Sequence, residues 1–167
     1  KLLLLQNIPL ALFVLVFVVF GLATRNWFTW TNFSNILTQS SYIGILAIGI
    51  TFVLLTGRTD LSVGAIMYLS AASAALMIQS GVSIVVALLA CIVIGVIYGC
   101  INAFFVVKVG IPPFVVTIGT MTAGRAIGLL MTHSEQIAMP AELVSSIGSS
   151  RLFGFLPYPV IIFAIVA

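Results

Sequence analysis

Long hydrophobic stretches alternate with short polar breaks along the whole chain. The stretches are of helical length and lack the alternating polar positions of barrel strands, so the pattern predicts helices that cross lipid. It predicts an all-α, polytopic transmembrane helix bundle with about five spans and a truncated sixth. The expected spans are residues 7–23, 36–55, 61–78, 83–107 and 113–131, followed by a stub from residue 156.

The composition supports a membrane protein. Hydrophobic residues make up 62% of the chain and charged residues 5%, and the mean hydropathy is +1.35. A soluble domain carries roughly 25% charged residues. A backbone in lipid must pair its polar groups internally, as helices do. The net charge of +3 comes from six scattered cations and three acidic residues, which argues against nucleic acid as a partner.

The break between the second and third spans carries two charges, Arg58 and Asp60. Helical positions two apart diverge by about 200°, so this pair cannot share one helix face and we expect non-helical backbone. Gly57 suits a left-handed helix end, and Asp60 suits an N-cap that accepts from the backbone N–H of Ser62 or Val63. Two alternatives remain open: a turn at the inner surface, or a deeper helix break that lines a cavity.

The remaining breaks set the expected topology. Gly110 is expected to end the fourth span and Pro113 to begin the fifth. Residues 25–35 mix aromatic and small polar side chains, which is typical of a membrane interface, with an aromatic recognition site as the alternative. Cation placement favours an inner N-terminus, which puts the polar stretch 132–151 outside.

Small residues recur at helical spacing and predict close helix packing. They form Gly95-xxx-Gly99, Gly124-xxx-Gly128 and an alanine-rich run at 71–75. Apolar burial does not drive helices together in lipid, so close backbone contact must do so. The chain is therefore expected to pack against partner helices.

The fifth span contains Arg125, a charge about 18 Å from its inner end. Such a charge is a functional candidate unless it reaches the headgroups, and both alternatives stay open. One face of this span carries small and hydroxyl-bearing residues: Thr117, Thr120, Gly124 and Gly128. This face either packs against another helix or lines a path for a polyhydroxylated solute. We hypothesise that Arg125 pairs with backbone carbonyls or a carboxylate to shape the inner wall.

Catalytic and metal-binding motifs are missing from the sequence. There is no nucleophile–base pair, carboxylate dyad, metal-ligand cluster or G-x-x-x-x-G-K-[ST] phosphate loop. Cys91 and Cys100 lack CxxC spacing and are expected to be packing residues. We therefore expect neither an enzyme nor a bound metal or cofactor.

Three blocks of sequence resemble a known transport family. TGRTDLSVGA (56–65) resembles the G-x-D-L-S-V-G signature of permease subunits of ABC sugar importers, of the ribose, xylose, arabinose and galactose class. Residues 107–132 resemble a second family block, and residues 32–57 resemble the segment entering the second span. The chain departs from the family at Arg58, where glycine or serine is usual, and at Ala126, where glycine is usual.

The resemblance implies a membrane subunit that forms the translocation path for a monosaccharide delivered by a periplasmic binding protein. It implies a multi-pass protein of the bacterial inner membrane, with residues 1–167 as one transmembrane permease domain and the N-terminal half of a longer chain. The implied partners are a cytoplasmic ABC ATPase, which hydrolyses the ATP, the sugar-binding protein and a second permease copy. The ATPase-docking loop would lie in the other half.

The motif residues are the candidate site. They are Gly57, Asp60, Leu61, Ser62, Gly64, Thr117, Gly119, Thr120 and Arg125. The alternative functions are a permease for branched-chain amino acids or other small solutes, and a non-transporting membrane anchor subunit. The sequence leaves open which sugar is carried and whether the permease pair is a homodimer or a heterodimer.

Overall fold

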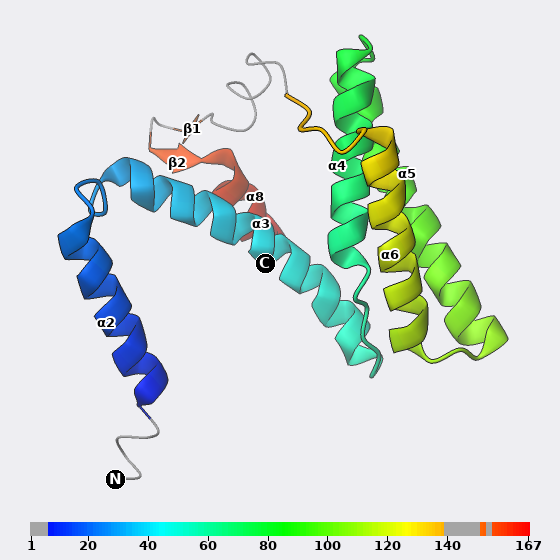
Figure 1. Cartoon of the computed structure of the whole chain (residues 1–167), viewed down its shortest axis with the longest axis horizontal. Helices are drawn as coiled ribbons and strands as arrows, with labels where there is room; N and C mark the ends of the chain where they lie inside the picture. The colour runs from blue at the N-terminus through cyan, green and yellow to red at the C-terminus, as the bar shows by residue number, and fades with distance from the viewer. Residues whose placement is uncertain (1–6, 139–150, 153–154) are drawn as a thin grey trace.

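The structure, a computed structural model, describes residues 7–138, 151–152 and 155–167. Helices account for most of the described chain (Figure 1). A short hairpin of two-residue strands, which the sequence pattern did not predict, precedes the last helix. The elements are α2 (Ile8–Ala23), α3 (Trp30–Leu55), α4 (Val63–Gln79), α5 (Ile84–Ala103), the π-helix η1 (Phe104–Val109), α6 (Pro113–Met131), β1 (Arg151–Leu152), β2 (Leu156–Pro157) and α8 (Tyr158–Val166).

The observed helices confirm the predicted all-α membrane fold. Three of them are long and apolar enough to cross a membrane: α3, α6, and α5 with η1 as one segment. The helices α2 and α4 are apolar but have 16 and 17 residues. At 1.5 Å per residue α4 rises about 26 Å, close to the roughly 30 Å of hydrocarbon. The chain is thus a helical membrane protein.

Two helix boundaries differ from the sequence-based expectation. Helix α3 begins at Trp30, six residues before the expected start at 36, because Thr29 caps it by accepting a hydrogen bond from the Asn32 N–H at 3.3 Å. Part of the expected interfacial segment 25–35 is therefore helical. The fourth span continues as η1 to Val109 before Gly110, at φ 82°, ends it as predicted.

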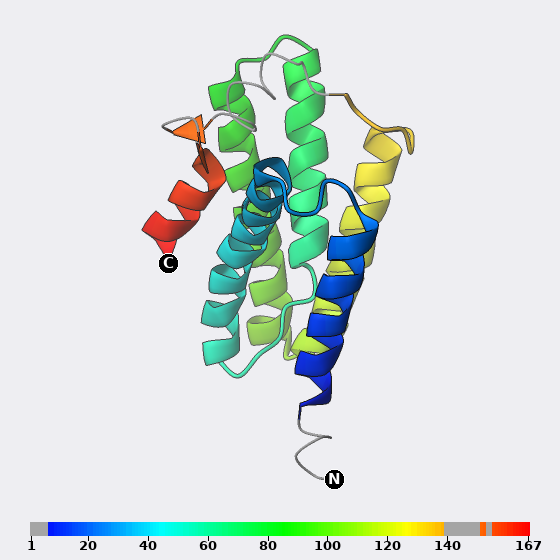
Figure 2. The same ribbon diagram turned by 90° about the vertical axis from the view of Figure 1, so that its left-hand side faces the viewer.

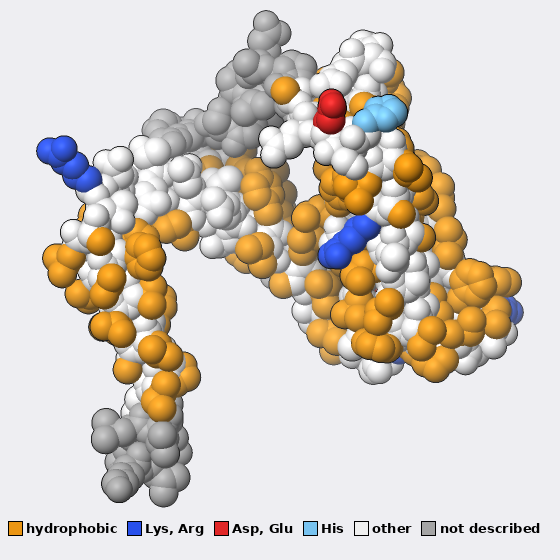
Figure 3. Space-filling model, in the orientation of Figure 1, with side chains coloured by type: hydrophobic (Ala, Val, Ile, Leu, Met, Phe, Trp, Pro, Cys, Tyr) orange, Lys and Arg blue, Asp and Glu red, His pale blue; other side chains and the backbone are white. Residues whose placement is uncertain are grey.

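Helices α4, α5 and α6 form one packed unit (Figures 1 and 2). Helix α4 packs against both α5 and α6, and its buried residues are mostly alanines. Alanine lets helix backbones approach closely, which supplies the dispersion contact that holds helices together in lipid. The larger apolar side chains of α5 point outward; Val96 and Ile97 are 59% and 50% exposed. Hydrophobic atoms cover much of the surface in Figure 3, as expected for a lipid-facing protein.

The two predicted glycine pairs behave differently. A Cβ added at Gly124 would lie 2.7 Å from Tyr98 Oη, and one at Gly128 would overlap the Tyr68 ring. This pair therefore packs, as predicted. Gly95 and Gly99 on α5 have no such neighbour within 4 Å among the described residues. Their face is not used for packing within the described part of the chain.

Helices α2, α3 and α8 lie outside this unit, and α2 is separated from it by the length of α3 (Figure 1). Helix α3 packs against α8, where the Phe163 ring fills the space that a side chain at Gly44 would need. Phe17 and Phe20 of α2 contact the Trp27 ring, with centroids 5.8 and 5.7 Å apart. The predicted outer stretch 132–151 is described only at 132–138 and 151, and its outer location stays a prediction.

Exchanging single glycines of α6 tests the packing. Gly128→Ala is expected to lower the free energy of unfolding by about 1–3 kcal/mol, because the methyl group displaces the Tyr68 ring. Gly119→Ala is the matched control: its Cβ meets open space, so the gain in helix propensity should leave stability equal or up to about 1 kcal/mol higher. Thermal unfolding of both variants in detergent measures the difference. Equal melting temperatures would contradict the packing.

Candidate functional site

The segment between α3 and α4 is non-helical, as its two charges predicted. Gly57 has φ 71°, in the left-handed region, and residues 58–62 adopt no regular structure. Asp60 Oδ1 accepts hydrogen bonds from the Ser62 backbone N–H at 2.8 Å and from Ser62 Oγ at 2.5 Å. The predicted acceptor role of Asp60 is thereby confirmed at Ser62. The prediction that Asp60 is the N-cap is wrong, because α4 begins at Val63 and its N-cap is Ser62.

Asn102 of α5 connects this segment to α6. Its Nδ2 donates to Ser62 Oγ at 2.9 Å, and its Oδ1 accepts from Thr120 Oγ1 at 2.8 Å. Ser62 is fully buried and Asn102 is 7% exposed. We call the chain of hydrogen bonds through Asp60, Ser62, Asn102 and Thr120 the polar clasp. It joins the 58–62 segment, α5 and α6 through side chains alone.

An amide inside an apolar span needs partners. Leaving its polar atoms unpaired would cost several kcal/mol, of order 2–7 for a group out of water. Both polar atoms of Asn102 are paired, and no described buried polar side-chain atom lacks a partner. Asn102 lies two residues before η1, and π-helical turns inside helices often mark functional sites. The pattern of apolar positions does not predict a role for Asn102. Its one distinguishing feature in the sequence is that it is the amide of the fourth span.

A cavity of about 220 Å³ lies beside the clasp. Its polar lining comes from Arg58, Thr59, Asp60, Asn102 and Thr117, and its apolar lining comes from Val53, Gly99, Ala103, Val106 and Pro113. The cavity therefore offers hydroxyl, amide and charged groups within a set of apolar helices. Such a lining can exchange hydrogen bonds with a small polar solute.

The connection from α3 to α4 lies against the helices that line the cavity, and its depth in the membrane stays a prediction. Figure 1 shows the connection from α3 rising beside the lower end of α6 before α4 begins. Irregular backbone at membrane depth occurs where it is covered by protein or lines a cavity. Asp60 lines the cavity. Ser62 is covered by protein and bonded to Asn102.

The structure brings together part of the predicted site. Asp60, Ser62 and Thr120 belong to the clasp. Thr117 is buried, lines the cavity and donates to the Pro113 carbonyl at 2.9 Å. The shared face of α6 is thus packed at its glycines and borders the cavity at Thr117.

The other predicted residues lie apart. Gly57, Leu61, Gly64 and Gly119 are exposed and make no side-chain contribution to the clasp. Arg125 is also exposed, and within the described residues it forms no hydrogen bond or ion pair. The expected partner of its guanidinium is therefore not among them, and its role in shaping an inner wall stays a prediction.

A cavity with polar lining between apolar helices is the arrangement expected of a membrane transport protein. Residues 32–167 match the family model described as "Branched-chain amino acid transport system / permease component". The chain belongs to this family, which confirms the predicted resemblance to ABC permeases.

Three curated relatives are similar over most of the chain. The galactofuranose transporter permease protein YtfT of Escherichia coli K12 is 39% identical over 128 residues, covering 77% of this chain and 37% of its own. The ribose import permease protein RbsC of Haemophilus influenzae is 34% identical over 165 residues, covering 96% of this chain and 50% of its own. The autoinducer 2 import system permease protein LsrC of Yersinia pseudotuberculosis serotype O:3 is 33% identical over 143 residues, covering 85% and 40%.

These matches also show how much of a relative the chain represents. The chain spans half or less of the length of these three proteins. No solved structure matches. Two of these relatives are named as galactofuranose and ribose permeases, which agrees with the sequence-based preference for sugar permeases over the alternatives.

A double-mutant cycle tests the clasp. Asn102→Leu is expected to destabilise by about 1–3 kcal/mol, because it leaves Ser62 and Thr120 without their shared partner. Combined with Thr120→Val, the two changes should be non-additive by at least about 0.5 kcal/mol. Thr122→Val is the matched control, since Thr122 Oγ1 bonds only the Ile118 carbonyl of its own helix among described residues. Additivity in both cycles, measured by unfolding in detergent, would contradict the clasp.

Proposed function

We propose that this chain forms part of the translocation path of an ATP-driven importer for a monosaccharide or a similar small polyol. The observation that carries the proposal is the cavity beside the polar clasp, where Asp60, Asn102 and Thr117 meet. Membership of the permease family and the similarity to galactofuranose and ribose permeases support it.

The clasp gives the path a two-state element. One side-chain hydrogen bond, from Asn102 to Ser62, joins segment 58–62 to α5, and Asn102 in turn accepts a bond from Thr120 of α6. Hydroxyl and amide groups can exchange these bonds for bonds to a solute hydroxyl at little net cost, since each is worth about 1 kcal/mol. Movement of the segment would then open or close the cavity as the importer alternates between outward and inward access.

The assembled importer would need further components. The sequence has no phosphate-binding loop, so a cytoplasmic ABC ATPase would hydrolyse ATP. A periplasmic sugar-binding protein would deliver the substrate, and a second permease copy would complete the path. The assembly would reside in the bacterial inner membrane. No metal or cofactor is assigned to this chain.

Branched-chain amino acids are the second candidate substrate class. The cavity holds one cation and one anion, Arg58 and Asp60, which would suit the two charged ends of an amino acid. The family description also names this transport system. Competition in vesicles separates the two: excess unlabelled leucine should leave sugar uptake unchanged, whereas excess ribose or galactose should reduce it. The reverse result would select the amino acid.

The carboxylate of Asp60 is expected to be required for uptake. Asp60→Asn keeps one acceptor oxygen but removes the negative charge that strengthens both hydrogen bonds to Ser62. A hydrogen bond to a charged group contributes about 1.5–3 kcal/mol. Uptake of labelled sugar by vesicles with the whole assembly should fall at least about tenfold, as 1.4 kcal/mol corresponds to a factor of ten. Glu135→Gln, in the segment after α6, should leave uptake unchanged. Normal uptake by the Asp60 variant would overturn the proposal.

Arg125 provides a separate test on α6. If Arg125 shapes the wall of the path, Arg125→Leu should reduce sugar uptake while the protein remains in the membrane. An Arg125 side chain that only reaches the headgroups would leave uptake unchanged. Arg125→Lys keeps the charge and should retain more activity. Wild-type uptake by the leucine variant, at equal amounts in the membrane, would refute a role in the path.

A further inference from the structure

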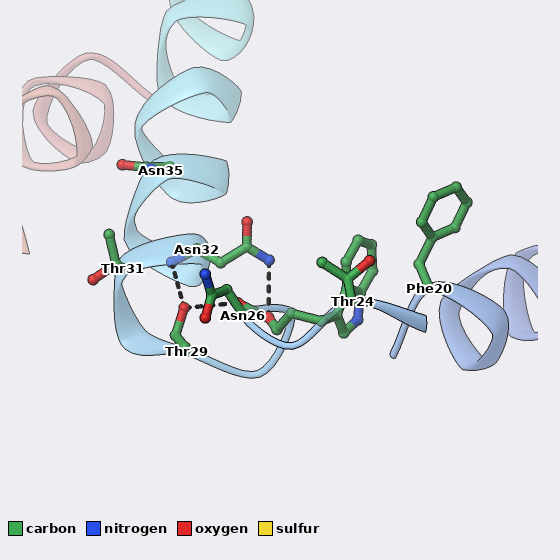
Figure 4. A pocket seen from close by; sticks show the side chains of 8 residues that line it. Phe20, Thr24, Asn26, Thr29, Thr31, Asn32 and Asn35 are labelled. Atoms are coloured by element: carbon green, nitrogen blue, oxygen red, sulfur yellow. Dashed lines mark hydrogen bonds between the residues drawn. The ribbon is translucent and has the colours of Figure 1, made fainter. Parts of the chain in front are cut away.

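The elbow between α2 and α3 carries a second, larger cavity of about 640 Å³ (Figure 4). It is separate from the clasp, since no residue lines both cavities. Its volume is within the roughly 300–1,000 Å³ of small-molecule sites. Its lining residues are Phe20, Thr24, Asn26, Trp27, Thr29, Thr31, Asn32 and Asn35, which we call the elbow pocket.

The chemistry of this lining is uncharged and rich in hydrogen-bonding groups. Six of its eight side chains are amides or hydroxyls and two are aromatic, and none is charged. The pocket holds three of the five asparagines in the whole sequence. Each amide offers donors and an acceptor at once, as each hydroxyl does. No charged side chain is among the lining residues, and the exposed Arg25 lies between Thr24 and Asn26 in the chain.

Part of the pocket is fixed by internal bonds. Asn32 Nδ2 donates to the Trp27 carbonyl at 2.9 Å, and Thr29 Oγ1 donates to the Asn26 carbonyl at 2.7 Å. The Trp27 ring stacks on Phe20 with centroids 5.7 Å apart and an interplanar angle of 25°. The aromatic surface and the turn are therefore held in place before any ligand arrives, which lowers the entropic cost of binding.

Other polar groups of the pocket remain open. The side chains of Thr24, Asn26, Thr31 and Asn35 are exposed and form no hydrogen bond with another described residue. Figure 4 shows Thr31, Asn32 and Asn35 on the first turns of α3, with Phe20 on the far side of the elbow. These four donor–acceptor groups line the pocket together with the two aromatic rings, and such groups can bond the several hydroxyl groups of a ring-shaped polyol.

We infer that the elbow pocket binds a neutral polyhydroxylated ligand, such as a monosaccharide unit. The pocket joins two apolar helices and has the aromatic and polar composition of a membrane interface, so it can be reached from water and from the lipid headgroups. The ligand can therefore be a free sugar or the sugar headgroup of a glycolipid. The inference does not depend on the transport proposal, because binding here needs no movement of the clasp.

Photolabelling of the assembled protein in lipid nanodiscs tests the inference. One arm uses a soluble hexose with a diazirine group, and the other a neutral hexosyl diacylglycerol with the same group. Labelled peptides are mapped by mass spectrometry, with unlabelled hexose as competitor. We expect saturable label within residues 20–35 in at least one arm, and the arm that labels identifies the source of the sugar.

Two helix-surface variants provide the comparison. Asn35→Leu removes a pocket amide without removing a described hydrogen bond, and should weaken labelling of 20–35 about fivefold, the effect of one lost hydrogen bond. Gln39→Leu, one turn further along α3 and outside the pocket, should leave labelling unchanged.

Three results would overturn the inference. The first is absence of saturable label in 20–35 in both arms, and the second is equal labelling of the wild type and Asn35→Leu. The third is loss of affinity for a sugar-loaded binding protein in Asn35→Leu without loss of label, which would make the elbow a protein-docking surface. Loss of uptake in clasp variants would leave the elbow label intact, so the two proposals fail separately.

Discussion

The buried amide of Asn102 is the interaction on which the arrangement of the site depends. It bonds Ser62 ahead of α4 and Thr120 on α6, while it belongs to α5 itself. Between helices in lipid, apolar side chains gain nothing by leaving the solvent, so specific contacts must decide which helices meet and where. Small residues allow α4, α5 and α6 to approach, through Ala65, Gly124 and Gly128. The amide then fixes the position of the non-helical segment that precedes α4.

This arrangement links packing to function. An entirely apolar three-helix unit would be stable in lipid and would offer nothing to a polar solute. The polar clasp places hydroxyl, amide and carboxylate groups beside a cavity while satisfying every buried polar side-chain atom that the structure describes. Bonds between such groups are individually weak in net terms, so they can be exchanged. The elbow pocket adds uncharged amide and hydroxyl groups at the other end of α3, with a fixed aromatic ring beside them.

The sequence was sufficient for the features that depend on local backbone chemistry. Gly57 and Gly110 adopt the left-handed conformation expected of them, and α6 begins at Pro113 and ends at Met131 as predicted. The start of α3 was predicted too late because hydropathy alone does not register the Thr29 cap. The role of Asn102 was missed for a different reason: its partners are 40 and 18 residues away, and no periodic pattern encodes a contact that forms only when three helices pack. Exposed residues of the motif, such as Gly64 and Gly119, have no described contact that explains them.

The most direct measurement is an experimental structure of the assembled protein in lipid, resolved well enough to place the Asn102 side chain. The account predicts its amide between Ser62 Oγ and Thr120 Oγ1, each within hydrogen-bonding distance, with Asp60 bonded to Ser62 and the cavity open beside them. An Asn102 amide turned toward lipid or bonded to another helix, with segment 58–62 detached from α5, would contradict the account.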